Sequence, residues 1–228
     1  MTELSRSTED YLKAIYGLGR SGEPVPTGAL ADALAIAPAS VSGMVRRLAE
    51  TDLIAHEPYR GVQLTDAGRR AALRVIRRHR ILETYLVKVL AWDWDSVHAE
   101  AERLEHAASD LLVARMADAL GNPAFDPHGA PIPTVDGEIE EQELVPLTEL
   151  GVGGTGEFRL VSDDDAERLR YIASIGFRVG TRFELVEVTP FRGPLTVLRR
   201  ELGASPQLIG YELAQSLLCL PCTLEPAA

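Results

Sequence analysis

Residues 79–106 read HRILETYLVKVLAWDWDSVHAEAERLEH, and this stretch decides how the rest of the chain is interpreted. Its apolar spacing predicts two helices joined near Trp92–Trp94. His79 and Glu83 would lie one helical turn apart on the first helix. Residues four, seven and eight positions apart also share one helix face, and the second helix would place four polar residues within an arc of roughly 100°. These four are His98, Glu102, Glu105 and His106.

A solvated helix face is the alternative interpretation of these polar residues. Two apolar stripes count against it, because His79 and Glu83 fall in the middle of the first stripe and Glu105 falls inside the second. Charged groups on a core-facing stripe are costly unless they are paired or bound to a metal. The first stripe is Leu73, Ile76, Leu82, Leu86, Val87 and Leu90, and the second is Val97, Ala101, Leu104, Ala108, Leu111, Leu112 and Met116. We therefore favour a site for a divalent cation, built from both helices.

The composition of the 228 residues limits the class of protein. Apolar residues make up 46% of the chain, enough for two or three small domains. The net charge of −11 is uneven: residues 1–90 hold 13 Lys+Arg against 10 Asp+Glu, and the remainder holds 10 against 24. A basic N-terminal part on an acidic body fits a DNA-binding protein. Two cysteines, no signal-peptide pattern and no apolar run of about 18 residues predict a cytoplasmic protein without a membrane span.

The N-terminal residues predict the start of a helix-turn-helix. Ser7-x-x-Asp10 is an acceptable capping box for a helix that ends near Leu18. Metal ligation is the other role open to Asp10. Pro24-Val25-Pro26 then interrupts the chain, and Thr27 would cap a second, short helix.

The segment Pro38–Glu50 predicts the recognition helix. Its outward face is small at the front and basic behind, which lets a helix enter the major groove while arginines hold phosphates. Two short alternating segments around Pro58–Gly61 predict a hairpin wing, with Arg60 at its tip. The DNA contacts expected from this winged helix-turn-helix are Thr27, Ala39, Ser40, Ser42, Gly43, Arg46, Arg47 and Arg60.

The C-terminal part predicts a small SH3-like β-barrel. A proline-rich connection, in which His128 is interpreted as a loop residue, and an acidic linker precede the barrel. Turn signals separate short β segments, as is typical of such barrels. The β segments are residues 155–161, 182–188 and 195–199, with a helix at 164–174 and a last apolar run at 208–220. The isolated pair Cys219 and Cys222 is interpreted as buried or incidental thiols rather than a zinc or redox site.

This order of elements resembles the diphtheria-toxin-repressor family of metal-activated repressors. The resemblance covers nearly the whole chain, and its most specific parts are His98–His106 and the Pro127–Pro133 loop; Thr8–Leu12 and Ala39–Ser42 carry it in the DNA-binding part. It implies a mainly α fold with small β parts. The implied domains are a winged helix-turn-helix (1–72), a helical metal-binding and dimerisation domain (73–143) and an SH3-like β-barrel (144–228).

The resemblance also implies the ligand groups. The primary site would be Asp10, Glu102, Glu105 and His106; the ancillary site would be His79, Glu83 and His98; barrel ligands would come from Asp164, Asp165 or Glu167. Iron-type members carry methionine and cysteine where this chain has Asp10 and Glu102, so the chain is similar to the manganese-responsive branch. Donors without sulfur also suit Mn²⁺, with Fe²⁺ as the alternative. That branch has an acidic residue where this chain has Lys13.

The expected function is that of a metal-dependent repressor of metal-uptake genes, which binds operator DNA as a homodimer when loaded with Mn²⁺ or Fe²⁺. The two half-sites would lie about one DNA turn, roughly 34 Å, or a multiple of it apart. A winged-helix regulator that responds to a small organic effector is the alternative, and it predicts an apolar pocket. An enzyme is not expected, since no H-E-x-x-H, catalytic triad order or glycine loop with lysine is present. Gly43 stands at the family's base-contacting glutamine position, so the operator sequence is not carried over.

Overall fold

The computed structural model describes residues 4–19, 22–57, 59–140, 142–162, 165–201 and 203–222. The chain divides into two compact units, each with a buried core of its own. The first unit comprises Met1–Leu82, Glu102–Met116 and Ile132–Ile139, and the second comprises Glu83–Ala101, Ala117–Pro131 and Glu140–Ala228. The predicted class, mainly α with a C-terminal β-barrel, is confirmed.

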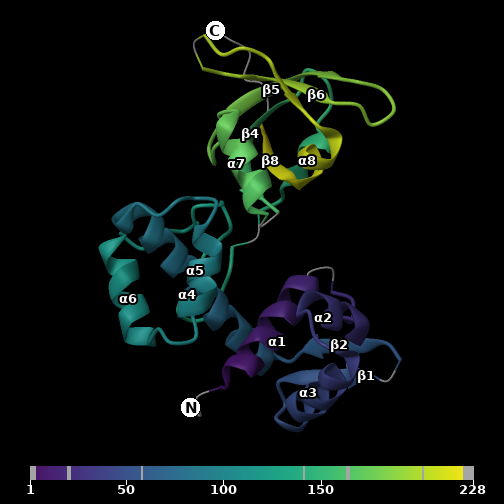
Figure 1. Cartoon of the computed structure of the whole chain (residues 1–228), viewed down its shortest axis with the longest axis vertical. Helices are drawn as coiled ribbons and strands as arrows, with labels where there is room; N and C mark the ends of the chain where they lie inside the picture. Colours follow the sequence, from purple (N-terminus) through teal and green to yellow (C-terminus); the bar gives the residue numbers. More distant parts are fainter. Residues whose placement is uncertain are drawn as a thin grey trace. The chain divides into compact units, whose positions relative to one another are not determined.

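The first unit begins with a winged helix-turn-helix (Figure 1). Its elements are α1 (Arg6–Leu18), α2 (Thr27–Ala33), α3 (Pro38–Glu50), β1 (Ile54–Glu57) and β2 (Gly61–Leu64). Leu12, Leu30 and Val41, one from each helix, are fully buried in its core. The hairpin pairs Ile54 with Leu64, and Val62 also bridges Val25, which fixes the wing to the segment before α2.

The predicted capping box at the first helix is wrong. Ser5 is the N-cap of α1, and its side chain accepts a hydrogen bond from the backbone N–H of Thr8. Because α1 starts at Arg6, the Asp10 carboxylate lies beyond the first turn and is not used for capping. Its side chain is therefore available for a contact outside α1.

Three helices follow the wing: α4 (Asp66–Leu90), α5 (Val97–Leu104) and α6 (Asp110–Ala119). The predicted second helix, continuous from Val97 to Met116, is thus interrupted. The Ser109 hydroxyl accepts from the backbone N–H of Leu112 and caps a new helix. Glu105 and His106 consequently lie in a turn, and not on the helix face from which their convergence was predicted.

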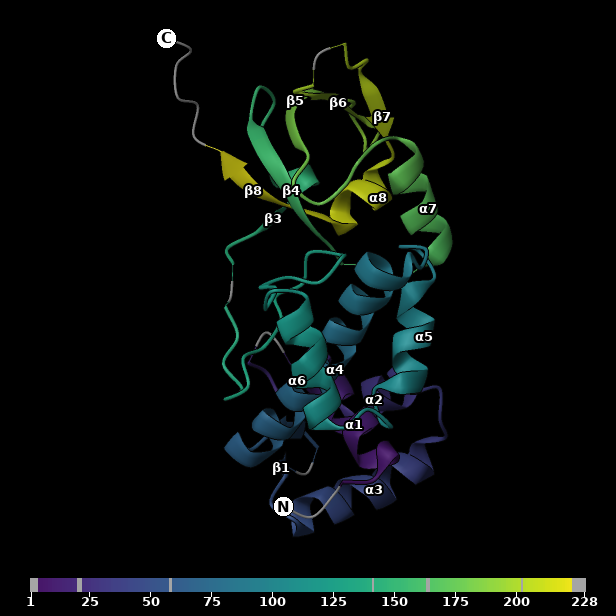
Figure 2. The same ribbon diagram turned by 90° about the vertical axis from the view of Figure 1, so that its left-hand side faces the viewer.

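The second unit holds a six-stranded antiparallel sheet in the order β3-β8-β4-β5-β6-β7, with α7 and α8 beside it (Figure 2). Its strands are β3 (Val145–Pro146), β4 (Thr155–Val161), β5 (Arg182–Val188), β6 (Leu195–Arg199), β7 (Gln207–Ile209) and β8 (Leu217–Cys222). The helices are the 3-10 turn η1 (Leu147–Glu149), α7 (Ala166–Ser174) and α8 (Tyr211–Ser216). The predicted apolar run 208–220 is therefore a strand, a helix and a second strand.

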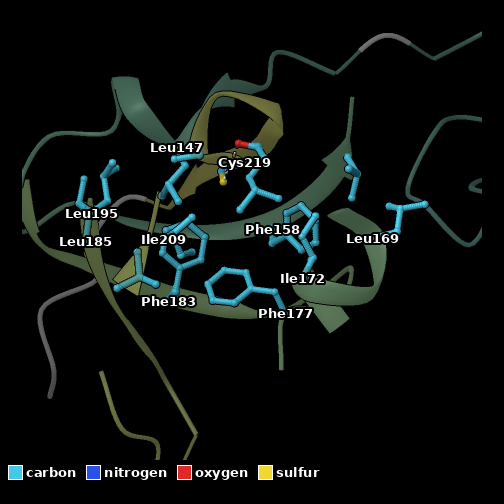
Figure 3. Packing of buried hydrophobic residues seen from close by; sticks show 14 residues of the cluster. Leu147, Phe158, Leu169, Ile172, Phe177, Phe183, Leu185, Leu195, Ile209 and Cys219 are labelled. Carbon is cyan, nitrogen blue, oxygen red and sulfur yellow. Dashed lines mark hydrogen bonds between the residues drawn. The ribbon is translucent and has the colours of Figure 1, made fainter. Parts of the chain in front are cut away.

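Three aromatic rings fill the centre of this barrel. Phe158, Phe177 and Phe183 are fully buried, with ring centroids 6.0 and 5.7 Å apart along the series (Figure 3). Cys219 belongs to the same core, whereas Cys222 is exposed. Burial raises the pKa of the Cys219 thiol to about 12, so this sulfur is not a thiolate at neutral pH.

Within the second unit, the loop at Pro127–Pro131 is fixed to strand β4. The backbone N–H of Val161 donates to the His128 carbonyl at 3.2 Å. Gly129 approaches β4 so closely that a Cβ there would lie 1.6 Å from the Arg159 carbonyl oxygen. The Trp94 Nε1 donates to the Pro127 carbonyl at 2.9 Å, and the Arg178 guanidinium lies over the Trp94 ring.

No helix among the described residues is by itself long and apolar enough to cross a membrane. The bent pair α2 and α3 meets the length and composition criteria when its two helices are taken together.

Candidate metal centre

Helix α1 and the turn after α5 bring three predicted ligands together. His106 Nε2 lies 2.8 Å from Asp10 Oδ1 and 3.3 Å from Glu105 Oε1. Donor atoms of the three residues all lie within 4.8 Å of one another. Burial raises the pKa of Asp10, a shift that nearby Glu105 supports and that His106 opposes. The group offers two carboxylates and one imidazole to a cation.

Glu9 contacts the other ring nitrogen of the same imidazole, and the sequence analysis did not predict this residue. His106 Nδ1 donates to Glu9 Oε2 at 2.7 Å, and the second oxygen of Glu9 forms an ion pair with Arg78. A carboxylate behind the imidazole is the usual second partner of a metal-ligating histidine, because it fixes the ring and leaves Nε2 as the ligand atom. Glu9 lies three positions before buried Leu12 and therefore on the apolar side of α1. A charged residue on that side was the sequence signal that could have identified it.

A second group adjoins the first and shares Glu105. His79, Glu102 and Glu105 also present donor atoms within 4.8 Å of one another. His79 Nδ1 lies 2.5 Å from Glu105 Oε2, and Glu105 is fully buried.

The Lys13 side chain lies within this second group. Its Nζ is 2.8 Å from Glu102 Oε1, 3.0 and 3.1 Å from the two Glu105 oxygens and 3.3 Å from His79 Nδ1. Burial alone would raise the pKa of Glu105, but the hydrogen bond from His79 and the Lys13 charge outweigh it and lower that pKa. Burial would likewise lower the pKa of Lys13, but Glu105 and Glu102 outweigh it and raise it, so the ammonium stays charged.

The second unit contains a third group, around Glu83. Glu83 Oε1 pairs with His98 Nδ1 at 3.1 Å, and Glu83 Oε2 lies 3.8 Å from His128 Nδ1. Donor atoms of Glu83, Asp126 and His128 lie within 4.8 Å of one another. His79 stands one turn before Glu83 on α4, and its membership of an ancillary site stays a prediction. Sequence reasoning missed Asp126 and treated His128 as a plain loop residue, because only the fold brings this loop to α4.

Among the predicted barrel ligands, Asp165 has another role. The Asp165 carboxylate caps α7, accepting from the backbone N–H groups of Glu167 and Arg168 at 2.8 and 3.2 Å. Glu167 is exposed, and neither residue belongs to a potential cation group among the residues described. Asp164 lies outside the described residues.

The predicted DNA-contacting residues lie on the exposed surface of the winged helix. Ala39, Ser40, Ser42, Gly43, Arg46 and Arg47 are exposed on α3, and Thr27, the first residue of α2, is half-buried. Arg60 is exposed at the wing and pairs with Glu57 at 2.8 Å. Tyr59 beside it is fully exposed with a positive φ of 67°, so the wing tip also presents an aromatic ring.

The donors around Asp10 fit a hard or borderline divalent cation. Carboxylate oxygens and imidazole nitrogens suit Mn²⁺ and Fe²⁺, and softer ions prefer sulfur. Neither cysteine takes part in a potential cation group within the described part of the chain. The hydrogen bond between buried Glu9 and half-buried His106 is the outer contact that a metal-bound imidazole needs. Fold and site together define a winged-helix DNA-binding protein with a potential cation group formed by α1 and the turn after α5.

The matches to family models cover the three parts of the chain. Residues 3–62 match the iron dependent repressor N-terminal DNA binding domain, and residues 65–134 match the iron dependent repressor metal binding and dimerisation domain. Residues 145–219 match the FeoA domain. The chain belongs to the family of the iron-dependent and diphtheria toxin repressors, as its sequence predicted, and it is not an enzyme.

Individual relatives agree with this assignment. The iron-dependent repressor IdeR of Mycobacterium tuberculosis is 36% identical over 160 residues, 67% of this chain and 70% of the relative. The diphtheria toxin repressor of Corynebacterium efficiens is 30% identical over 82% of this chain and 85% of its own length. A solved structure of a manganese-dependent transcriptional repressor in complex with manganese is 40% identical with a TM-score of 0.88, covering 94% of this chain and 100% of that one.

Proposed function

We propose that this chain is a Mn²⁺-responsive repressor of metal-uptake genes, which binds operator DNA as a homodimer and takes Fe²⁺ as the alternative ion. The observation that carries the proposal is the meeting of Asp10, Glu105 and His106, with Glu9 behind the imidazole. Asp10 and Glu102 place carboxylates at the two positions where iron-type members carry methionine and cysteine, and this exchange of sulfur for oxygen favours manganese. The manganese-bound relative described above supports the same choice.

The site residues connect ligand binding to the position of the DNA-binding domain. Asp10 lies on α1, which packs in the same core as α3, while His106 and Glu105 lie in the turn after α5. A bound divalent cation would supply positive charge between these carboxylates. Asp10 and His106 would thereby hold α1 to the dimerisation domain, and α3 would be held with it. The free energy that couples metal binding to DNA binding would come from this contact between α1 and the dimerisation domain.

The proposal includes further assignments of residues, domains and location. Glu102, implied for the primary site by the resemblance, shares the second group with His79 and Glu105 and pairs with Lys13. Glu83, Asp126 and His128, the third group, would bind a cation in the other unit. The family models match 3–62, 65–134 and 145–219, so the proposed boundary at 143 lies between two matches and the one at 72 lies inside the second. A cytoplasmic location follows from access to operator DNA.

The test compares DNA binding with and without metal. Full-length wild type, Asp10→Asn and the control Asp136→Asn, which changes an exposed acid in the linker, are stripped of metal and titrated onto DNA from the chain's own promoter by fluorescence anisotropy. Mn²⁺ should increase the affinity of the wild type and the control and leave that of Asp10→Asn nearly unchanged. DNA affinity that is independent of Mn²⁺ and Fe²⁺ in all three proteins would show that the trigger lies elsewhere.

A further inference from the structure

The ammonium of Lys13 sits where a cation would sit. Four donor atoms surround its Nζ within 3.3 Å: one oxygen of Glu102, both oxygens of Glu105 and Nδ1 of His79. These donors come from the three residues of the second potential cation group. The ammonium donates hydrogen bonds to the Glu102 and Glu105 oxygens, and His79 Nδ1, which also lies 2.5 Å from Glu105 Oε2, is beside it. The Lys13 side chain is largely enclosed, with 22% of it exposed.

The two potential cation groups are adjacent because they share Glu105. One group consists of Asp10, Glu105 and His106, and the other of His79, Glu102 and Glu105. Asp10 and Lys13 are three positions apart on α1 and so lie on the same face of that helix. Helix α1 therefore offers an anionic ligand to the first group and a cationic side chain to the second.

Lysine suits this position better than arginine does. Its ammonium is a compact point charge with three donors on a flexible stem, whereas a guanidinium is a planar fork. Of the 23 Lys and Arg residues in the chain, only Lys13 and Lys88 are lysines. The ammonium partly neutralises Glu102 and Glu105, and it contacts the same atoms that a second metal ion would require.

We propose that Lys13 is the built-in cation of the second group and limits this centre to one divalent ion, held by Asp10, Glu105 and His106. The inference rests on the proposed function, because it assumes that the first group binds Mn²⁺. Removing the ammonium takes away the cation that Glu102, Glu105 and His79 contact in the wild type. Replacing it with a carboxylate adds a ligand to that set. Either change should admit a second ion beside the first.

The experiment counts ions and tests whether they are adjacent. Full-length wild type, Lys13→Gln, Lys13→Glu and Lys13→Arg are dialysed against Mn²⁺, and bound metal is measured by mass spectrometry and by electron paramagnetic resonance. Lys88→Gln, which changes the exposed lysine in the last turn of α4, is the matched control. Circular dichroism checks the fold of each variant, and Lys13→Glu gives a second reading if Lys13→Gln does not fold.

The expected result is about one more Mn²⁺ per chain in Lys13→Gln and Lys13→Glu than in the wild type, with the magnetic coupling of ions about 3.5–4 Å apart. Wild type, Lys13→Arg and Lys88→Gln should have equal counts and no coupled pair. Unchanged counts in both folded variants, or a coupled pair in the wild type, would overturn the role of Lys13. A wild type without bound Mn²⁺ beside a Lys13→Glu that binds it would overturn the proposed function alone, and no Mn²⁺ in any protein would overturn both.

Discussion

The imidazole of His106 is held between two acids at consecutive positions of α1. Glu9 contacts Nδ1 and Asp10 contacts Nε2, both within 2.8 Å. The Asp10 contact requires that α1 start one residue after Ser5, because a later start would use the Asp10 carboxylate as part of a cap. Whether Ser5 or Ser7, two positions later, serves as the N-cap thus decides whether the Asp10 carboxylate can reach His106.

Glu9→Gln should weaken Mn²⁺ binding by about 10-fold to 100-fold, the range found when an outer partner of a ligating histidine is lost. The amide no longer carries the charge that favours an Nδ1 donor, so Nε2 becomes a poorer ligand. Isothermal titration calorimetry measures the dissociation constant. Glu23→Gln, at an exposed acid between α1 and α2, should match the wild type. Equal affinities in Glu9→Gln and the wild type would contradict the positioning role.

His128 should make the metal-free protein's stability depend on pH. Burial lowers the pKa of His128, but its contact with Glu83 and the nearby Asp126 outweigh burial and raise it. Because the folded-state pKa is raised, the protonated ring stabilises the fold fully at pH values below the ordinary histidine pKa of 6.5. This stabilisation is lost as pH rises through the folded-state pKa. In chelator, the drop in Tm of His128→Asn relative to the wild type should be larger near pH 5.5 than near pH 8.5. An equal drop at both pH values would mean that the histidine acts only through packing.

Side-chain spacing predicted Glu105 and His106 as ligands and the family resemblance added Asp10, but neither could predict their neighbours. Each neighbour lies far in sequence from its partner. Glu9 is 97 positions from His106, Lys13 is 89 positions from Glu102, and Asp126 is 43 positions from Glu83. Such partners depend on how α1, α4 and α5 are arranged, and no local periodicity contains that information. In the sequence, Lys13 stands out only as a departure from the manganese-responsive branch, and its place within the ligand set depends on the fold.

Among the elements, the recognition helix and wing followed directly from local signals, while the helix after residue 97 did not. Proline at the first position of α3 and alternation around Gly61 predicted those elements to within a residue. The apolar period of the second dimer helix continues through residues 105–109, which hid the break. Ser109 followed by Asp110 was the overlooked start signal.

The wing should depend on glycine at position 61. Gly61 has φ +130°, and a Cβ there would lie 2.3 Å from the Val25 carbonyl oxygen. Gly61→Ala should therefore destabilise the protein by about 1–3 kcal/mol, as measured by urea unfolding. Gly28→Ala is the matched control, because Gly28 lies in α2 with no atom within 4 Å of the added Cβ. That change should stabilise by roughly 0.5–1 kcal/mol. Similar stability changes in both variants would argue against the close approach.

At the scale of the whole molecule, the dimerisation domain must present apolar surface to a second copy. On α6, Leu111 and Leu112 remain 71% and 46% exposed within the chain, although sequence periodicity placed them on the inward stripe. The stripe was predicted correctly as apolar, but its partner is expected to be another chain rather than this chain's own core. A periodicity cannot distinguish these two kinds of burial.

Leu111→Glu should raise the dimer dissociation constant at least about 100-fold, because each interface residue occurs twice in a symmetric dimer and a buried leucine contributes roughly 1.5–3 kcal/mol. Sedimentation velocity over a concentration series measures the change. Val135→Glu alters a comparably exposed apolar residue, 80% exposed in the segment after the proline-rich loop, and should leave the dimer intact. A Leu111→Glu protein that sediments like the wild type would place the interface away from α6.

The fastening of the Pro127–Pro131 loop to β4 has a consequence for proteolysis. The covalent route into the barrel runs through the acidic residues after Ile139, yet the barrel is also joined to the loop and to Trp94 by backbone and side-chain contacts. A protease that nicks the acidic connection should therefore yield two fragments that still elute together from a sizing column. The barrel fragment should separate from the N-terminal fragment only when denaturant breaks those contacts.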